Sequence, residues 1–206
     1  MHCSKCQALC ASRSTIVDPD LPAMDAPCRV LVIGEAPGAE EDKAGKGFVG
    51  RAGQTLHHLM EANGFTRGRD YGCANVVRCR PPDNRRPTPR EVFNCLPLLA
   101  DTIRVANPTA VVTVGETSTR AITGIMGLYQ NIQALHQYQQ DPHQAEMLCH
   151  PEIKAAWPAD TLLIPMPHTS PLAWNRNAPG GEKWKNIGER QIILAAYIRD
   201  QTACRK

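Results

Sequence analysis

Four cysteines have the type and spacing of a metal-binding set. Cys3 and Cys6 are separated by two residues, and Cys79 and Cys95 have 15 residues between them. Four thiolates are the ligand set of tetrahedral zinc and also of a [4Fe–4S] cluster. The spacing alone does not distinguish zinc from iron–sulfur, and Cys10 could replace one of the four ligands.

The number of cysteines indicates the cellular compartment of the protein. The chain has nine cysteines, an odd number, and its first 20 residues lack the apolar stretch of a signal peptide. We therefore expect a protein that is not secreted but stays in a reducing cytoplasm, prokaryotic or that of a viral host, where disulfides are rare. Cys28 and Cys73 flank predicted strands and are expected in the core. Cys149 and Cys204 have no readable partner.

Three side chains in predicted loops or at strand ends have the chemistry to bind a planar heterocycle. The amide of Asn75 offers a donor and an acceptor that match the edge of a pyrimidine. Phe48 lies among glycines and could stack on a base. His168 could donate a hydrogen bond to a developing oxyanion. The alternatives are a turn asparagine, a buried aromatic anchor and a structural histidine.

Two further segments carry groups suited to DNA. Ser170 and Arg176 could bind phosphate oxygens, and Leu172 is an apolar residue in a polar loop, of the kind that proteins insert into a base stack. Five arginines of a proline-rich segment could follow a phosphate backbone: Arg78, Arg80, Arg85, Arg86 and Arg90. Because the net charge is only +3, the chain as a whole does not require an acidic partner, and the prediction depends on this local concentration of charge.

Strands that alternate with helices must position these groups. Short apolar runs predict strands at 29–33, 71–77, 110–114 and 161–166. Helical spacing predicts helices at 54–63, from the N-cap Thr88 to 103, from 117, and over 182–199. Three segments are expected to be irregular (1–28, 35–53 and 168–176), and 126–160 is expected to be a mostly helical or irregular excursion.

This order of elements predicts βαβ units, hence a parallel sheet with helices on both faces, in a single domain over 1–206. Ligands of such sheets bind at the carboxyl ends of the strands, where the loops with the candidate residues converge. No window approaches the roughly 18 apolar residues of a transmembrane helix, so we expect no membrane partner.

In its motifs and their order the chain resembles the iron–sulfur uracil-DNA glycosylases of family 4, within the uracil-DNA glycosylase superfamily. The matching blocks occur in order along the chain: Gly34-Glu35-Ala36-Pro37-Gly38, Glu41-Asp42-Lys43, 45–50, 52–54, 75–82, 84–85, Pro87, Glu91, Cys95, and His168 with its loop. They cover most of residues 1–120 and then 160–176.

The resemblance implies a three-layer α/β/α sandwich around a central four-stranded parallel sheet. It implies that Cys3, Cys6, Cys79 and Cys95 hold a [4Fe–4S] cluster with a structural role. It also implies a monomeric enzyme whose substrate is single- or double-stranded DNA containing uracil. The uracil would be flipped out into a pocket and released by hydrolysis of its N-glycosidic bond.

Roles for individual residues follow from the same resemblance. Phe48 would stack on the uracil, Asn75 would read its Watson–Crick edge, and His168 would stabilise negative charge on O2 as the bond breaks. Glu41 would exclude the methyl group of thymine. Ser170, Leu172, Arg176, Arg80 and Arg85 would contact the DNA strand.

The sequence departs from the superfamily at the position that activates water. The better-known branch has an aspartate where this chain has Ala36, and alanine cannot act as a base. Either Glu35 contributes, or most of the catalysis comes from stabilising the leaving base through His168 and Asn75, which we favour. Backbone amides near Glu35 and Ala36 would line the pocket.

Two more departures leave the target base open. Gly47 stands where the family usually has proline, and the loop after His168 is more similar to that of the aspartate-containing branch, with Leu172 as its wedge. Uracil is favoured, with hypoxanthine or a modified pyrimidine as alternatives. A hypothesis from another class is a non-catalytic iron–sulfur DNA-binding protein. There is no Arg/His-rich insert of the kind found in members that crosslink to their product, so covalent capture is not expected.

Overall fold

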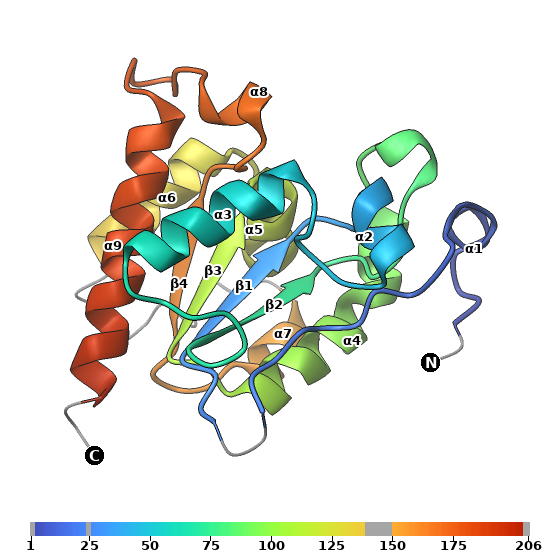
Figure 1. Ribbon diagram of the computed structural model, residues 1–206, viewed down its shortest axis with the longest axis horizontal. Coiled ribbons are helices and arrows are strands. Elements are labelled where there is room, and N and C mark those ends of the chain that lie inside the picture. The colour runs from blue at the N-terminus through green and yellow to red at the C-terminus, as the bar shows by residue number, and fades with distance from the viewer. Residues whose placement is uncertain (1–2, 24–25, 139–149, 204–206) are drawn as a thin grey trace.

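A four-stranded, all-parallel sheet forms the centre of the protein in a computed structural model that describes residues 3–23, 26–138 and 150–203. The strands are β1 (Val30–Gly34), β2 (Tyr71–Asn75), β3 (Ala110–Val114) and β4 (Leu162–Met166). They lie in the order β2-β1-β3-β4 (Figure 1). The predicted α/β class, with a central parallel sheet of four strands, is therefore confirmed.

Alternate residues of each strand face the two helical layers, because successive side chains of a strand point to opposite sides. Val30 and Val32 pack with Leu56 of α3 (Arg51–Ala62) and Ile192 of α9 (Trp184–Ala203). Figure 1 looks onto this face. Burial on both faces explains why the strands read as continuous apolar runs rather than as alternating ones.

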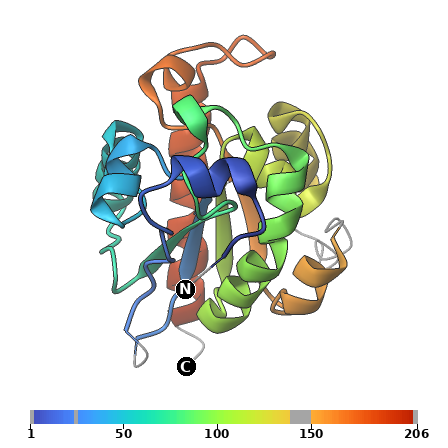
Figure 2. The ribbon, with the colours of Figure 1, turned by 90° about the vertical axis from the view of Figure 1, so that its right-hand side faces the viewer.

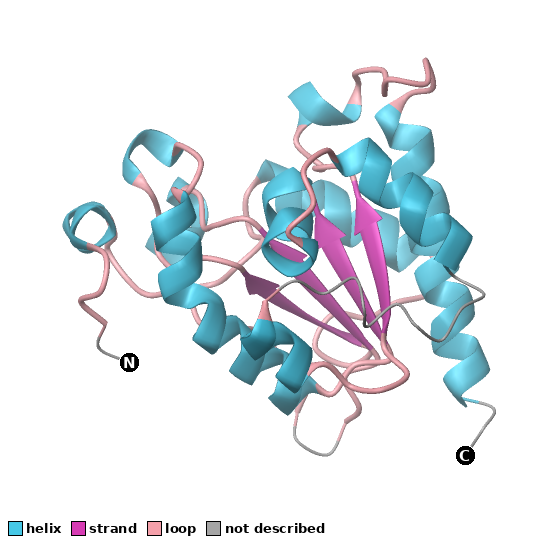
Figure 3. Cartoon of the chain, turned by 180° about the vertical axis from the view of Figure 1, so that it is seen from behind, coloured by secondary structure: helices cyan, strands magenta, loops and turns pink. Residues whose placement is uncertain are grey.

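The opposite face of the sheet, seen from behind in Figure 3, is covered by four helices. They are α4 (Pro89–Ala106), α5 (Glu116–Thr123), α6 (Leu128–Tyr138) and α7 (Pro151–Ala156). Leu31 and Ile33 of β1 pack here with Leu99 of α4 and Ile122 of α5. Figure 2 shows the molecule turned by a quarter, with the central strands running between the helices.

Four short helical segments are not predicted from the sequence: three lie in the segments expected to be irregular, and one lies in the proline-rich segment. These are α1 (Gln7–Ser12), α2 (Ala39–Ala44), the 3-10 turn η1 (Pro82–Asn84) and α8 (Pro171–Trp174). Each is six residues or fewer, which is too short to display helical periodicity. Proline at the first position of α8, where no amide is needed, is the sequence signal that was missed.

Other boundaries move by a few residues. α3 begins at Arg51 rather than 54, and β2 ends at Asn75 rather than 77. The predicted Thr88 cap is confirmed: Thr88 Oγ1 accepts from the Glu91 amide, and Glu91 Oε2 accepts from the Thr88 amide. Part of the 126–160 excursion is helical, as α6 and α7, but 139–149 lies outside the described residues. That the whole chain forms one domain stays a prediction.

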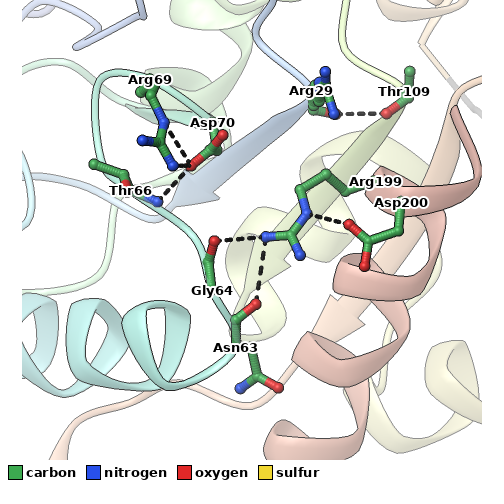
Figure 4. Close-up of polar contacts among 9 residues, drawn as sticks. All are labelled: Arg29, Asn63, Gly64, Thr66, Arg69, Asp70, Thr109, Arg199 and Asp200. Atoms are coloured by element: carbon green, nitrogen blue, oxygen red, sulfur yellow. Dashed lines mark hydrogen bonds and ion pairs between the residues drawn. The ribbon is translucent and has the colours of Figure 1, made fainter. Parts of the chain in front are cut away.

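The amino-terminal edge of the sheet is closed by polar contacts (Figure 4). Arg199 of α9 donates to the carbonyls of Asn63 and Gly64 at the end of α3, and its guanidinium lies 4.2 Å from the centre of the Phe65 ring. Thr109 Oγ1 donates to the Arg29 carbonyl at 2.8 Å. These contacts hold α9, α3 and the strand starts together at the edge opposite the carboxyl ends.

Among the described helices, none is long and apolar enough to cross a membrane.

Candidate active site

A cavity of about 310 Å³ opens at the carboxyl ends of the strands. Its walls come from 34–38 after β1, Asn75 at the end of β2, Val114 at the end of β3, His168 after β4, and the first turn of α3. The volume is at the small end of the range for ligand pockets, roughly 300–1,000 Å³, and suits a single nucleobase. Of the predicted pocket residues, Glu35, Ala36, Glu41, Phe48, Asn75 and His168 all line this cavity.

Gly34 lets two of these side chains meet over the end of β1. A Cβ atom at Gly34 would lie 2.5 Å from Asn75 Oδ1 and 2.7 Å from Phe48 Cζ, closer than carbon and oxygen can approach. The Phe48 ring and the Asn75 amide therefore occupy the space that any side chain at position 34 would take. A flat apolar surface and a polar amide are brought together at one place in the cavity.

The backbone of Phe48 is held in the left-handed conformation, with φ of 59°, which a bulky residue rarely adopts. Three neighbours fix it there. His57 Nε2 lies 2.9 Å from the Phe48 carbonyl oxygen, and His57 Nδ1 lies 2.7 Å from the Tyr71 hydroxyl. Arg67 donates to the Gly47 carbonyl at 2.7 Å. A Cβ at Gly53 would collide with the Phe48 backbone at 2.2 Å, so α3 packs directly on this turn.

His168 is oriented by a backbone hydrogen bond. The Ser170 amide donates to His168 Nδ1 at 3.0 Å, so Nδ1 is an acceptor, and in the neutral ring the proton is on Nε2. Burial lowers the pKa of His168, with Arg86 acting in the same direction and the nearby Glu35 opposing. The ring is therefore a neutral imidazole near pH 7 that can donate a hydrogen bond through Nε2–H.

Glu41 ties two parts of the cavity wall together. Its Oε2 accepts from the Gly38 amide at 3.0 Å, and its Oε1 accepts from the Gly50 amide at 2.7 Å. Gly38 precedes α2 and Gly50 precedes α3. The carboxylate thus fixes the entrance to both helices while it lines the cavity.

The structure corrects one part of the predicted arginine surface. Arg78 is only 8% exposed: it pairs with Asp18 and donates to Thr102 Oγ1 of α4 at 2.8 Å. It braces α4 and is not available to a phosphate. Arg85 lines the cavity, but its guanidinium forms two hydrogen bonds with the Glu91 carboxylate, at 2.7 and 2.8 Å.

The segment after His168 presents an exposed apolar residue on a rigid support. Leu172 is 71% exposed and lies on α8, not in the irregular loop that the sequence predicts. Trp174 of the same helix is buried against Gly188 of α9, and Thr169 Oγ1 donates to the Ala52 carbonyl of α3 at 2.7 Å. Arg176 is exposed just beyond α8.

Sequence reasoning missed several residues that shape the cavity. Asn84 lines it with φ of 53°, and Arg80 donates to its side-chain oxygen at 2.8 Å. His57 and Arg67, which hold the turn at Phe48, lie on α3 and in the connection to β2. A signal was available for Asn84, since asparagine tolerates positive φ and follows Asp in a proline-rich stretch. None was available for His57 or Arg67, whose partners are distant in sequence.

The four predicted ligand cysteines are neighbours in space. Cys79 and Cys95 are each 6% exposed. The pKa of Cys95 is raised to about 11, mainly by burial and also by the nearby Cys79, Cys6 and Cys3, against the effect of a backbone hydrogen bond from Arg78. The Cys79 sulfur accepts a hydrogen bond from Arg13 at 2.8 Å, and the Cys6 sulfur accepts one from Asn94 at 3.2 Å.

Four cysteines are a donor set that zinc and a [4Fe–4S] cluster both use. Within the described ranges, no group of three or more His, Cys, Asp or Glu side chains converges closely enough to hold a metal ion. A [4Fe–4S] cluster instead has its four thiolates around a body larger than one ion. Cys10 lies beside this set, with its sulfur 3.4 Å from the Cys3 carbonyl oxygen, so its part in ligation stays open. Cys28 and Cys73 are buried, as expected.

The fold, the cavity at the carboxyl ends of the strands and the four neighbouring cysteines agree with a comparison of the sequence with known families. A profile described as "Uracil DNA glycosylase superfamily" matches residues 21–189. The chain belongs to the uracil-DNA glycosylase superfamily.

Within the superfamily the chain is similar to type-4 uracil-DNA glycosylases. It is 46% identical to that of Pyrobaculum aerophilum over 98 residues, which are 48% of this chain and 50% of the relative. It is 48% identical to that of Thermotoga maritima over 90 residues, 44% of this chain and 46% of the relative. The chain thus spans about half the length of these curated relatives. A type-5 uracil-DNA glycosylase of Pyrobaculum aerophilum is 32% identical over 153 residues, 62% of this chain and 67% of the relative.

The state of His168 can be measured without an activity assay. We expect nitrogen-detected NMR to show a neutral ring with the proton on Nε2 and a pKa below the ordinary value of about 6.5. Since the folded pKa is below the unfolded one, protonation favours the unfolded chain, and the stability contributed by His168 falls as the pH drops below about 6.5.

Two substitutions at position 170 test whether the backbone amide of Ser170 sets the tautomer of His168. Ser170→Pro removes the amide that donates to Nδ1, and we expect it to release the tautomer. Ser170→Ala keeps that amide and should leave the tautomer unchanged. A parental ring protonated on Nδ1, or a Ser170→Pro variant with an unchanged tautomer, would contradict this assignment.

Proposed function

We propose that the protein is a DNA repair glycosylase that hydrolyses the N-glycosidic bond of uracil and leaves an abasic site. The observation that carries the proposal is the meeting of Phe48, Asn75 and His168 in one base-sized cavity, in a chain of this superfamily. A protein that only binds DNA has no need of a cavity that combines a stacking surface, an amide and a hydrogen-bond donor.

Recognition of the base depends on the two side chains that meet over Gly34. Phe48 provides the face on which a flipped uracil stacks, a contact worth about 1–3 kcal/mol per base. The Asn75 amide donates to one polar atom of the uracil edge and accepts from the adjacent one. Glu41, fixed at Gly38 and Gly50, lies in the cavity wall where it would exclude the methyl group of thymine.

Catalysis depends on stabilising the leaving base. As the bond between the sugar C1′ and the base nitrogen breaks, its electron pair goes to the uracil, and the negative charge is shared with O2. Neutral His168 donates its Nε2–H to that oxygen, and the first turn of α3, the positive end of a helix, lines the same cavity. Water then adds to C1′ of the sugar, and the proton that this water loses is taken up by the uracil anion, so that the products are neutral uracil and an abasic site.

The group that orients this water has a smaller role in the proposed mechanism than the groups that stabilise the leaving base. Ala36 lines the cavity but has no group that could take a proton. Glu35 lines it too and lies close enough to His168 to raise its pKa, so it is the carboxylate available to orient water. We propose that its contribution is smaller than that of His168 and Asn75.

Contacts with DNA would surround the cavity. Leu172, exposed on α8 beside His168, would fill the space that the flipped base leaves. Ser170 and Arg176 flank it, and Arg80 lies near Asn84 at the cavity rim. Arg85 would contribute less than predicted, because its charge is already paired with Glu91.

We propose that Cys3, Cys6, Cys79 and Cys95 hold a [4Fe–4S] cluster. When bound, the cluster would be held by four iron–thiolate bonds, which would join the N-terminal segment to the start of the proline-rich loop and to α4. Its role would be structural, with no electron transfer in the reaction. The match of these four cysteines to the family motif supports this role, as do the N–H groups of Arg13 and Asn94, which donate to the sulfurs of Cys79 and Cys6.

The central test is excision of uracil from a single-stranded oligonucleotide, read as abasic sites. Removing one donor to a developing oxyanion typically costs about 10²–10³ in rate. We expect losses of this size for His168→Ala and Asn75→Ala with the fold retained. Arg104→Gln, at an exposed position of α4, is the matched control. If the parental protein at micromolar concentration, with its metal bound, does not cleave, the proposal fails and the non-catalytic DNA-binding hypothesis is left. Excision assays with hypoxanthine, xanthine and modified pyrimidines would test which base is the target.

The wedge role of Leu172 predicts a difference between substrates. Unstacking a base from a duplex costs a few kcal/mol, and less is needed in a single strand. Leu172→Ala should therefore slow excision from duplex DNA about tenfold while single-stranded excision changes little. Ile193→Ala, an exposed apolar residue of α9, should affect neither. Equal losses on both substrates would contradict the wedge.

The cluster predicts metal content directly. Protein purified without oxygen should contain about four iron atoms per chain and absorb broadly near ~400 nm. Cys95→Ser should lower the iron content sharply, whereas Cys28→Ser, a buried cysteine outside the set, should not. Stoichiometric zinc in place of iron would show that the cysteines form a zinc site.

A further inference from the structure

Asp42 is a buried carboxylate that neither the base pocket nor the cysteine set accounts for. It is 3% exposed and lies on α2. The Ser14 amide donates to both of its oxygens, at 2.9 and 2.8 Å, and the Thr15 amide donates to Oδ1 at 3.2 Å. Burying a carboxylate is costly unless it is well hydrogen-bonded, so these contacts tie 14–15 firmly to α2.

Arg13, the residue before Ser14, makes the connection to the cysteines. It donates to the Cys79 sulfur at 2.8 Å and to the Cys3 carbonyl at 2.6 Å. It is also the C-cap residue that directly follows α1. In Figure 2, α1 lies between α2 and α4, so the chain after Arg13 runs from the cysteine set directly to α2.

Glu41, the residue before Asp42, makes the connection to the base pocket. Its carboxylate accepts from Gly38 and Gly50, which line the cavity. α2 has only six residues, so a shift of Asp42 would carry Glu41 with it. Val17 continues the contact: its amide donates to the Arg78 carbonyl, and its side chain lies 3.9 Å from the position of a Cβ at Gly47, next to Phe48.

We propose that Arg13 and Asp42 are a pair of positioning residues that couple the cysteine set to the base pocket. Arg13 fixes the segment at Cys79 and Cys3, and Asp42 transfers that position through α2 to Glu41 and the cavity wall. The inference rests on the proposed function and the proposed cluster, and it adds that an intact cysteine set is needed to hold the pocket in its binding geometry.

Asp42→Asn is a nearly isosteric test. Both oxygens of Asp42 accept from backbone amides, so one of the two must be replaced by an NH₂ group that faces a donor. Loss of a charge-assisted hydrogen bond of this kind corresponds to about tenfold in an equilibrium constant. We expect the metal-loaded variant to bind free uracil about tenfold more weakly, with KM for a uracil oligonucleotide raised more than kcat is lowered. Asp101→Asn, an exposed aspartate of α4, should change neither.

A second measurement does not depend on uracil. Amide hydrogen exchange over 38–50 should be about tenfold faster in Asp42→Asn than in the parent, while exchange in β3 stays the same. If the parent neither binds nor cleaves uracil, the proposed function fails, but the exchange experiment still tests the coupling.

Arg13→Gln tests the other end of the pair. It removes a cationic donor from the Cys79 sulfur, so the midpoint potential of the cluster should become more negative. Although Arg13 is not among the residues that line the cavity, we also expect faster exchange over 38–50. Arg104→Gln is the matched control. Combining Arg13→Gln with Asp42→Asn should add little to the effect of the stronger single variant.

Two results would overturn the inference. The first is an Asp42→Asn variant whose uracil affinity and pocket exchange stay within about twofold of the parent. The second is an Arg13→Gln variant that changes the potential while the pocket exchange does not move. If Asp42→Asn fails to fold, the Arg13→Gln exchange result decides alone.

Discussion

The cavity at the carboxyl ends of the strands depends on the absence of a side chain at Gly34. This glycine ends the strand that lies between β2 and β3, and both the Phe48 ring and the Asn75 amide reach into the space over it. In a parallel sheet the carboxyl ends of all strands meet at one edge, so the end of β2 contributes the Asn75 amide and the loop after β4 contributes His168 to the same small volume. Gly34 leaves that volume open, and the other groups are arranged around it.

Strain at one residue is compensated by several contacts around it. Phe48 is in a conformation that costs of the order of 1–3 kcal/mol for a residue of its kind, and the surrounding groups keep it there. His57, Arg67 and the first turn of α3 all contact the backbone at 47–48. Because these contacts come from α3 and from the connection to β2, the Phe48 ring is positioned before any ligand arrives, which would reduce the entropy lost on binding.

Much of this arrangement could be predicted from the sequence. The strands of β-branched residues, the Thr88 cap and the convergence of the strand ends follow from local patterns, and the pocket residues follow from motifs that match a known family. The short helices α1 and α2 could not be predicted, because one or two turns show no periodicity, whereas the proline that begins α8 is a local signal. Nor could the burial of Arg78: an arginine in a basic stretch is typical of a surface, and only the tertiary structure places Asp18 and Thr102 beside it.

The polar contacts at the amino-terminal edge of the sheet stabilise the fold at a distance from the cavity, which lies at the opposite edge. Arg199 fastens α9 to the end of α3 and covers Phe65, at the far end of the strands from the cavity. The opposite edge contains the positive-φ turn at Phe48 and the half-buried imidazole of His168, which are poor choices for stability. Such a division allows the two edges to change independently, so that substitutions near Arg199 can offset the cost of new loop sequences around the cavity and leave the same framework open to a different ligand.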